Sequence, residues 1–169
     1  MTSQHTTTVD EEARTITVER TFAADAERLW QAWTDPALVA RWYGPHHWTT
    51  TVHEMDVRPG GRWRYTMAPD DGSRPPMNGV ATYEDVEPPH RLTYLDRIAD
   101  DAWTAAVGEP GLSVAVTFEP TPEGTRVRVV AGFGDDEGLR RGIASGMSGG
   151  YVETLDRLAS VVLPGHGPE

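Results

Sequence analysis

The sequence predicts an α+β fold in which one antiparallel sheet of about seven strands wraps around a long C-terminal helix. Apolar residues recur every four positions through residues 138–163, which indicates a single amphipathic helix. Short segments of alternating polarity, separated by turn sequences, fill most of residues 48–133 and are typical of an antiparallel meander. A twisted sheet of this kind cannot bury its concave face on itself, and only the last helix is long enough to cover it.

The first elements are a strand and two short helices. Residues 14–22 alternate apolar and polar side chains, which predicts a half-buried strand. Helices are expected near residues 25–33 and 36–42. Asp25 is a suitable N-cap for the first helix, and Asp35, followed by a proline at the first helical position, is a strong start signal for the second.

Six strands are predicted to follow, joined by short turns rich in glycine, proline and aspartate. Their expected ranges are 48–57, 62–68 with an extension over 73–77, 78–86, 91–98, 112–119 and 125–133. The irregular residues 99–111 are expected to form a mobile flap. The resulting order, βααββββββα, is the helix-grip arrangement.

The C-terminal helix contains an unusual number of glycines. Asp135 or its neighbour Asp136 is expected to provide the N-cap. Gly142, Gly146 and Gly150 are spaced by four and would form a smooth groove on one side of the helix. Each would destabilise the helix by about 0.5–1 kcal/mol relative to alanine. Two interpretations remain open, close packing against the sheet and room for a ligand between helix and sheet.

Length and composition indicate one domain with two short tails. Residues 14–163 are predicted to form the domain, whereas residues 1–13 and 164–169 are expected to be disordered. Residues 1–13 are polar and acidic and lack the apolar core of a signal peptide, and no apolar run approaches the roughly 20 residues of a membrane span. A cytoplasmic location is therefore expected.

Charge and residue usage exclude several functions. The formal net charge of −11 argues against nucleic acid and anionic membranes as partners, because both require clustered positive charge. Cysteine is absent, which excludes disulfides and thiol chemistry, and every basic residue is arginine, which excludes a Schiff base on lysine. No catalytic signature is present and no three residues have metal-ligand spacing, so we expect no cofactor and no metal. His46 and His47 are adjacent and are expected to point in opposite directions in a solvated loop.

Four groups of short motifs resemble a known family. They are Phe-Ala-Ala at 22–24 with Leu-Trp-x-Ala-Trp-Thr-Asp-Pro at 29–36, Trp-Tyr-Gly-Pro at 42–45, Asp-Val-Arg-Pro-Gly-Gly-x-Trp at 56–63, and Pro-Pro-x-Arg-Leu at 88–92. The chain resembles, over about residues 14–163, the START-like or Bet v 1-like (SRPBCC) superfamily, and within it the family named after the activator of Hsp90 ATPase homologue 1. The resemblance implies a helix-grip fold with a ligand cavity, but fold alone does not fix function.

Aromatic residues gather in segments expected to border the space between sheet and helix. Large aromatic side chains with a few hydroxyl groups suit a planar apolar ligand. Filling of the core is the alternative for each of them. The predicted ligand-binding residues are Trp42, Trp63, Tyr65, Met67, Tyr83, Tyr94, Asp96, Gly146, Met147 and Tyr151.

Asp96 is the one acidic member of this set. It shares a strand face with Leu92 and Tyr94, where proteins of the family that the chain resembles often place an aromatic residue. On an inner face the carboxyl would have a raised pKa or need a donor such as arginine or tyrosine. The alternative is that the strand has already emerged at the sheet edge by this residue.

Three functions are compatible with these observations. The favoured hypothesis is binding of a hydrophobic, aromatic or polyketide-like small molecule, with enediyne resistance by sequestration or self-sacrifice as a special case. The second is an enzyme of the polyketide cyclase or dehydratase type, with Asp96, His53 or a tyrosine transferring protons. The third, suggested by the family name, is a chaperone-interacting or stress-related regulatory protein.

Overall fold

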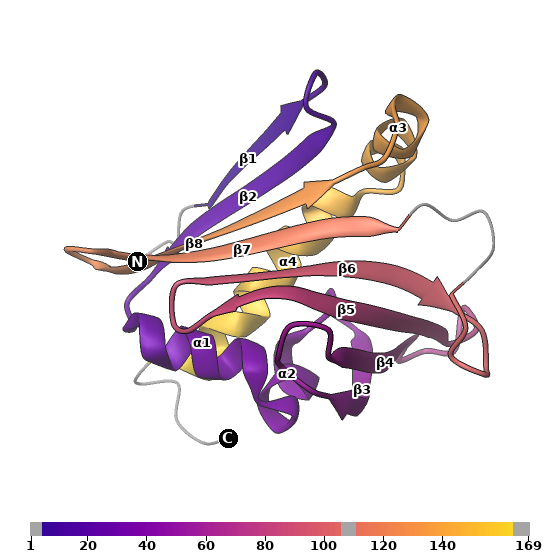
Figure 1. Cartoon of the computed structure of the whole chain (residues 1–169), viewed down its shortest axis with the longest axis horizontal. Helices are drawn as coiled ribbons and strands as arrows, with labels where there is room; N and C mark the ends of the chain where they lie inside the picture. The colour runs from indigo at the N-terminus through magenta and orange to yellow at the C-terminus, as the bar shows by residue number, and fades with distance from the viewer. Residues whose placement is uncertain (1–4, 106–110, 164–169) are drawn as a thin grey trace.

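The structure, a computed structural model, describes residues 5–105 and 111–163 and confirms the helix-grip architecture. Among the described residues, one antiparallel sheet is formed by β1 (His5–Asp10), β2 (Thr15–Phe22), β3 (Trp48–Met55), β4 (Arg62–Pro69), β5 (Met77–Glu87), β6 (Arg91–Ala99), β7 (Leu112–Thr121) and β8 (Gly124–Gly132). The helices are α1 (Ala26–Thr34), α2 (Pro36–Trp42), α3 (Asp136–Ala144) and α4 (Met147–Val162). Figure 1 shows α4 crossing the concave face of the sheet.

The sheet order is β1-β2-β8-β7-β6-β5-β4-β3. β2 pairs with β8, so a strand near the start of the chain lies beside the last strand of the sheet (Figure 1). β1 and β3 form the two edges. Every neighbouring pair is antiparallel, and buried residues alternate along β2, β4, β7 and β8, as the sequence predicts.

The predicted starts of the short helices are confirmed. The Asp25 side chain accepts a hydrogen bond from the backbone N–H of Arg28, and the Asp35 side chain accepts one from Ala37, with Pro36 at the first helical position. These caps satisfy backbone donors that a helix leaves unpaired at its N-terminus. The sequence of this region therefore determines two helices that pack over one end of the sheet.

The N-terminal prediction needs correction. Residues 1–13 were expected to be a disordered tail, yet His5–Asp10 forms β1 and pairs antiparallel with β2 in register from His5 with Arg20 to Asp10 with Thr15. This strand brings the sheet to eight strands rather than about seven. All six of its residues are exposed, so it lacks the alternation that reveals a half-buried strand. Residues 1–4 and the predicted tail 164–169 lie outside the described residues.

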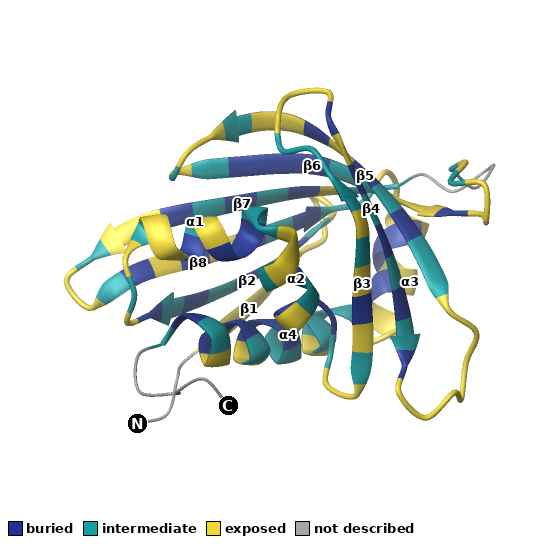
Figure 2. Ribbon diagram, turned by 90° about the horizontal axis from the view of Figure 1, so that it is seen from below, coloured by how far each residue is buried: buried dark blue, intermediate teal, exposed yellow. Residues whose placement is uncertain are grey.

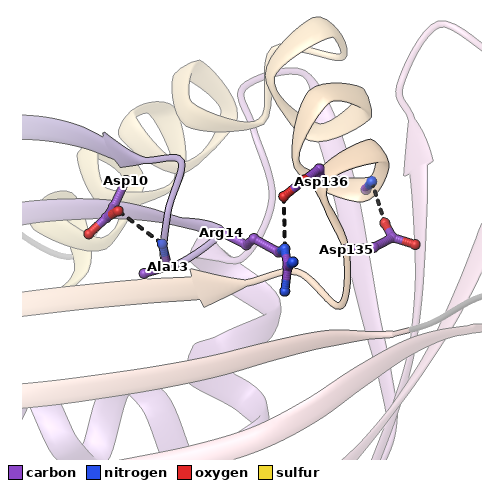
Figure 3. A network of polar contacts seen from close by, with 6 residues as sticks. Asp10, Ala13, Arg14, Asp135 and Asp136 are labelled. Atoms are coloured by element: carbon purple, nitrogen blue, oxygen red, sulfur yellow. Dashed lines mark hydrogen bonds and ion pairs between the residues drawn. The ribbon is translucent and has the colours of Figure 1, made fainter.

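The C-terminal helix is also different from the prediction, because it is broken in two. α3 ends at Ala144, and α4 begins at Met147 after Gly146, whose φ of +80° lies in the left-handed region. Asp135 caps α3, as predicted, by accepting a hydrogen bond of 2.7 Å from the N–H of Gly138. The Arg14 guanidinium in the β1–β2 turn also pairs with Asp136 at 2.8 Å, so α3 has its own attachment to the sheet (Figure 3).

The core lies where α1, α2 and the second half of α4 pack against the sheet. Figure 2 shows buried residues along the inner side of these helices. Trp33 and Trp42 pack edge to face with their ring centroids 4.6 Å apart, and Trp33 also contacts Phe118 of β7. Leu155 and Leu158 of α4 are fully buried in the same cluster. None of the helices in the described residues is long and apolar enough to cross a membrane.

Candidate functional site

A cavity of about 390 Å³ lies at the other end of the sheet, between α3, the start of α4 and the ends of β4–β8. Its apolar wall is formed by Met77, Ile98, Leu112, Phe133 and Met147. A smaller cavity of about 250 Å³ adjoins it beneath α4 and reaches Tyr43, Met67 and Tyr151. We call these the main cavity and the side cavity. Tyr65, Met77, Asp96, Ser145 and Met147 line both, so the two spaces meet at these residues.

Tyr65 and Asp96 form a hydrogen-bonded pair where the two cavities meet. The Tyr65 hydroxyl donates to the Asp96 carboxyl and lies 2.9 Å from Oδ1 and 2.8 Å from Oδ2. Tyr65 is on β4 and Asp96 on β6, with β5 between them. The structure therefore places Asp96 on the inner face with a tyrosine donor, rather than beyond the edge of the sheet.

Gly79 of β5 makes this pairing possible. It is the register partner of Tyr65, and a Cβ atom built on Gly79 would lie 2.2 Å from Tyr65 Cζ. The tyrosine ring therefore lies directly over the backbone of β5 and extends towards β6. An isolated glycine within a strand is a signal of such a close approach.

The surroundings of Asp96 keep its carboxyl partly protonated at neutral pH. Burial raises its pKa to about 7, although the hydrogen bonds from Tyr65 and from the backbone of Arg97 act in the opposite direction. Among the described residues, no arginine or histidine forms an ion pair with Asp96. The pKa of the Tyr65 and Tyr151 hydroxyls is raised, chiefly by burial and further by the Asp96 charge, so both phenols are neutral.

The α3 side of the main cavity is built on close packing and polar groups. A Cβ on Gly142 would lie 2.7 Å from Phe133 Cζ, so the missing side chain lets the phenylalanine ring pack against α3. Ser145 lies at the break between the helices. Arg97 and Arg141 line the exposed mouth, and Arg141 also pairs with Glu137 at 3.0 Å. The cavity is thus apolar along its walls, acidic at its floor and basic at its rim.

The sequence of the chain matches the model of one protein family. Residues 23–162 match the model of the activator of Hsp90 ATPase homologue 1-like proteins. The chain belongs to this family. The family supports a START-like, ligand-binding helix-grip fold, and it confirms the resemblance carried by the sequence motifs. No functionally curated protein matches the chain.

Solved structures of bacterial proteins are similar over nearly the whole chain. A protein from Mycobacterium smegmatis is 27% identical with a TM-score of 0.87, covering 98% of this chain and 100% of its own. A protein from Arthrobacter aurescens is 26% identical with a TM-score of 0.86, covering 97% of this chain and 98% of its own. An AHSA1-like protein from Aeromonas hydrophila is 26% identical with a TM-score of 0.69, covering 92% of this chain and 99% of its own.

In this member of the Hsp90-activator-like family, the predicted ligand-binding residues fall into three groups. Tyr65, Asp96 and Met147 line both cavities, and Met67 and Tyr151 line the side cavity. Gly146 instead lines an open surface groove that also contains His46 and His47. The four remaining residues, Trp42, Trp63, Tyr83 and Tyr94, are buried and line neither cavity.

These four residues belong to the core for a physical reason. Trp42 Nε1 donates to the Ala32 carbonyl at 2.9 Å, which ties α2 to α1. Trp63 and Tyr83 each pack edge to face against Tyr94, with ring centroids 5.6 and 6.0 Å apart. Trp42 packs against Trp33 and Tyr43, and the other three rings pack against one another. Composition could identify the aromatic set but could not show which rings would pack together in the core.

Several residues that form the wall of the main cavity were not identified from the sequence. Met77, Leu112, Phe133 and Ser145 line it, and Gly79 positions its tyrosine. Phe133 could have been identified from the sequence, because it continues the alternating series of inward-facing residues of β8 just beyond the last paired residue. Ser145 carried none, since its position depends on the break between α3 and α4. Within the described residues, no group of three potential metal ligands is present.

Proposed function

We propose that the protein binds a hydrophobic small molecule, aromatic or polyketide-like, in the main cavity. The observation that carries this proposal is one hydrogen-bonded carboxyl at the floor of a space of about 390 Å³ whose walls are mainly apolar. Binding sites of roughly 300–1,000 Å³ with few polar groups are typical for small molecules. Phe133, Met77 and Met147 would contact the apolar body, while Asp96 and Tyr65 would orient one polar group.

Titration with an environment-sensitive aromatic dye tests this proposal. Saturable binding to the wild-type protein is expected. Met147 lines both cavities, so Met147→Trp should fill the space and abolish dye binding. Met147→Leu is the matched control, because it nearly conserves volume and should retain binding. Absence of dye binding to the wild-type protein, or equal binding by both variants, would contradict the proposal.

A second candidate is proton-transfer catalysis of the cyclase or dehydratase type. A carboxyl with a pKa of about 7 can donate and accept protons near neutral pH, and Tyr65 lies in direct contact with it. The expected test substrate is an aromatic β-hydroxy ketone, whose loss of water is followed by mass spectrometry. Asp96→Asn should remove turnover while dye binding persists. Equal rates with wild-type protein, the Asp96→Asn variant and buffer alone would exclude this reaction.

Sequestration or self-sacrifice against enediynes is the special case of the binding proposal. Cβ atoms built on Gly149 and Gly150 would meet no atom within 4 Å, so this side of α4 is open. A diradical could take a hydrogen atom from such a Cα, and the carbon radical left behind would add dioxygen to form a peroxyl radical, whose breakdown cleaves the backbone at that residue. Mass spectrometry after exposure to an activated enediyne should show cleavage at one glycine. An intact chain with bound compound would support sequestration alone.

A further inference from the structure

In the described part of the chain, the Asp96 carboxyl has neutral hydrogen-bond donors but no positively charged partner. Its two oxygens share the hydroxyl of Tyr65, and the backbone of Arg97 also hydrogen-bonds the carboxyl. A carboxylate has about four lone-pair positions, so a ligand can still approach as a donor. Among the described side chains, none forms an ion pair with Asp96, and most of the residues that line the cavities with it are apolar or aromatic, with Ser145 and Thr154 as neutral polar exceptions. A partly buried carboxylate in such surroundings is stabilised most by a nearby positive charge.

We propose, on the basis of the proposed function, that the main cavity takes a hydrophobic amine, an apolar ring system whose protonated nitrogen pairs with Asp96. The nitrogen would donate to the carboxylate positions that Tyr65 and the Arg97 backbone leave unfilled. The ring system would lie along Phe133, Met77 and Met147. Two aromatic residues, Tyr65 and Phe133, line the same space, and aromatic faces attract cations.

The other charged and titratable groups around Asp96 do not replace this cation. Neutral phenols face it from β4 (Tyr65), β5 (Tyr83), β6 (Tyr94), the end of α2 (Tyr43) and α4 (Tyr151), since burial raises the pKa of each. The remaining charges, Arg97 of β6 and Arg141 of α3, are exposed at the rim. An anionic ligand would meet these arginines in solvent but would be repelled at the floor.

Three naphthalene derivatives of similar shape test whether the cavity prefers a cationic, a neutral or an anionic ligand. They are 2-(aminomethyl)naphthalene, 2-naphthalenemethanol and 2-naphthoic acid, titrated by calorimetry at about pH 8, where Asp96 is mostly ionised and the amine is mostly protonated. The amine is expected to bind at least about tenfold more tightly than the alcohol, because hydrogen bonds to a charged group are the stronger ones. The acid should bind most weakly.

Two matched variants test whether the negative charge of Asp96 causes the preference for the amine. Asp96→Asn keeps the shape and removes the charge, so the amine should lose its advantage while alcohol binding changes little. Tyr65→Phe keeps the carboxylate and should retain the preference. Lowering the pH to about 5 should likewise reduce amine binding but not alcohol binding, because Asp96 becomes protonated.

The outcomes distinguish the two proposals. Equal or tighter binding of the alcohol or the acid by the wild-type protein would overturn the amine proposal and leave small-molecule binding intact. Failure of all three probes to bind would overturn both. Far-ultraviolet circular dichroism establishes that each variant is folded, and the comparison of probes on the wild-type protein decides the question even where a variant fails to fold.

Discussion

The two ends of the interface between the sheet and α4 have opposite character. At one end, which we call the closed end, α1, α2 and the second half of α4 pack against the sheet through Trp33, Trp42 and Leu158. At the other, the open end, α3 and the first turns of α4 enclose the two cavities. The helix α4 takes part in both ends.

The difference arises from the size of the side chains that α4 presents. Leu155, Leu158 and Val162 are buried at the closed end, whereas Gly150 adds no side chain where α4 borders the side cavity. Close packing at the closed end stabilises the fold because it buries apolar area. Looser packing at the open end leaves room for a ligand. One helix thus divides into a half that supports the fold and a half that borders the site.

The largest expected effect tests the closed end. Trp33 is only 3% exposed and contacts Trp42 and Phe118, so Trp33→Ala should lower the free energy of unfolding by about 3–5 kcal/mol. Phe133→Ala, the matched truncation at the open end, should have a clearly smaller effect because its ring already borders a cavity. Chemical denaturation measures both. Equal losses would contradict the division into a closed and an open end.

The next largest effect is a pH dependence of the free energy of unfolding, which arises from Asp96 at the open end. The folded-state pKa of Asp96 is about 7, above the roughly 3.9 of an unfolded chain, so the folded protein binds the extra proton between these values. Its stabilising contribution is complete below about pH 4 and is lost as the pH rises through about 7. The loss approaches a few kcal/mol, at roughly 1.4 kcal/mol per pKa unit.

Asp96→Asn should remove this slope. Urea denaturation of the wild-type protein and the variant between about pH 4 and pH 8 measures it as a difference, which cancels the contributions of other groups. The variant should gain stability relative to the wild-type protein as the pH rises. Parallel profiles would show that the carboxyl is as well solvated in the folded protein as in the unfolded one.

The smallest effects separate two glycines at the start of α4. Gly150 is helical with open space where a Cβ would lie, so Gly150→Ala should raise stability by about 0.5–1 kcal/mol. Gly146 also has open space, but its φ of +80° would strain alanine, and Gly146→Ala should lower stability by about 1 kcal/mol. Thermal melts of the pair measure both signs. A stabilising Gly146→Ala would indicate that α3 and α4 can join into one helix.

Local signals in the sequence predicted most of the fold. The caps at Asp25, Asp35 and Asp135 each identify a helix start within a few residues, because they satisfy backbone donors locally. The alternation along β7 and β8 likewise identifies two strands and their inner faces. β1 escaped prediction because its pairing with β2, rather than its own pattern, makes it a strand.

The site was less predictable because it depends on non-local geometry. The conflict between a carboxyl and an inner strand face did identify Asp96 and the kind of donor that it needs. The glycines at spacing four suggested one groove, but the structure gives them separate roles: Gly142 makes room for Phe133, Gly146 breaks the helix, and Gly150 borders the side cavity. No periodic pattern distinguishes these roles, since each is set by residues distant in sequence.

The pairing of β2 with β8 also governs the order in which the chain can fold. Thr15 pairs with Gly132 and Phe22 with Thr125, so these partners lie more than a hundred residues apart. While the chain is being synthesised, one edge of β2 stays without its final neighbour until β8 has left the ribosome. Contacts of such long sequence separation slow folding because their loop-closure entropy must be overcome first. The exposed, polar β1 occupies the other edge of β2 from the start and shields it against pairing with a second chain.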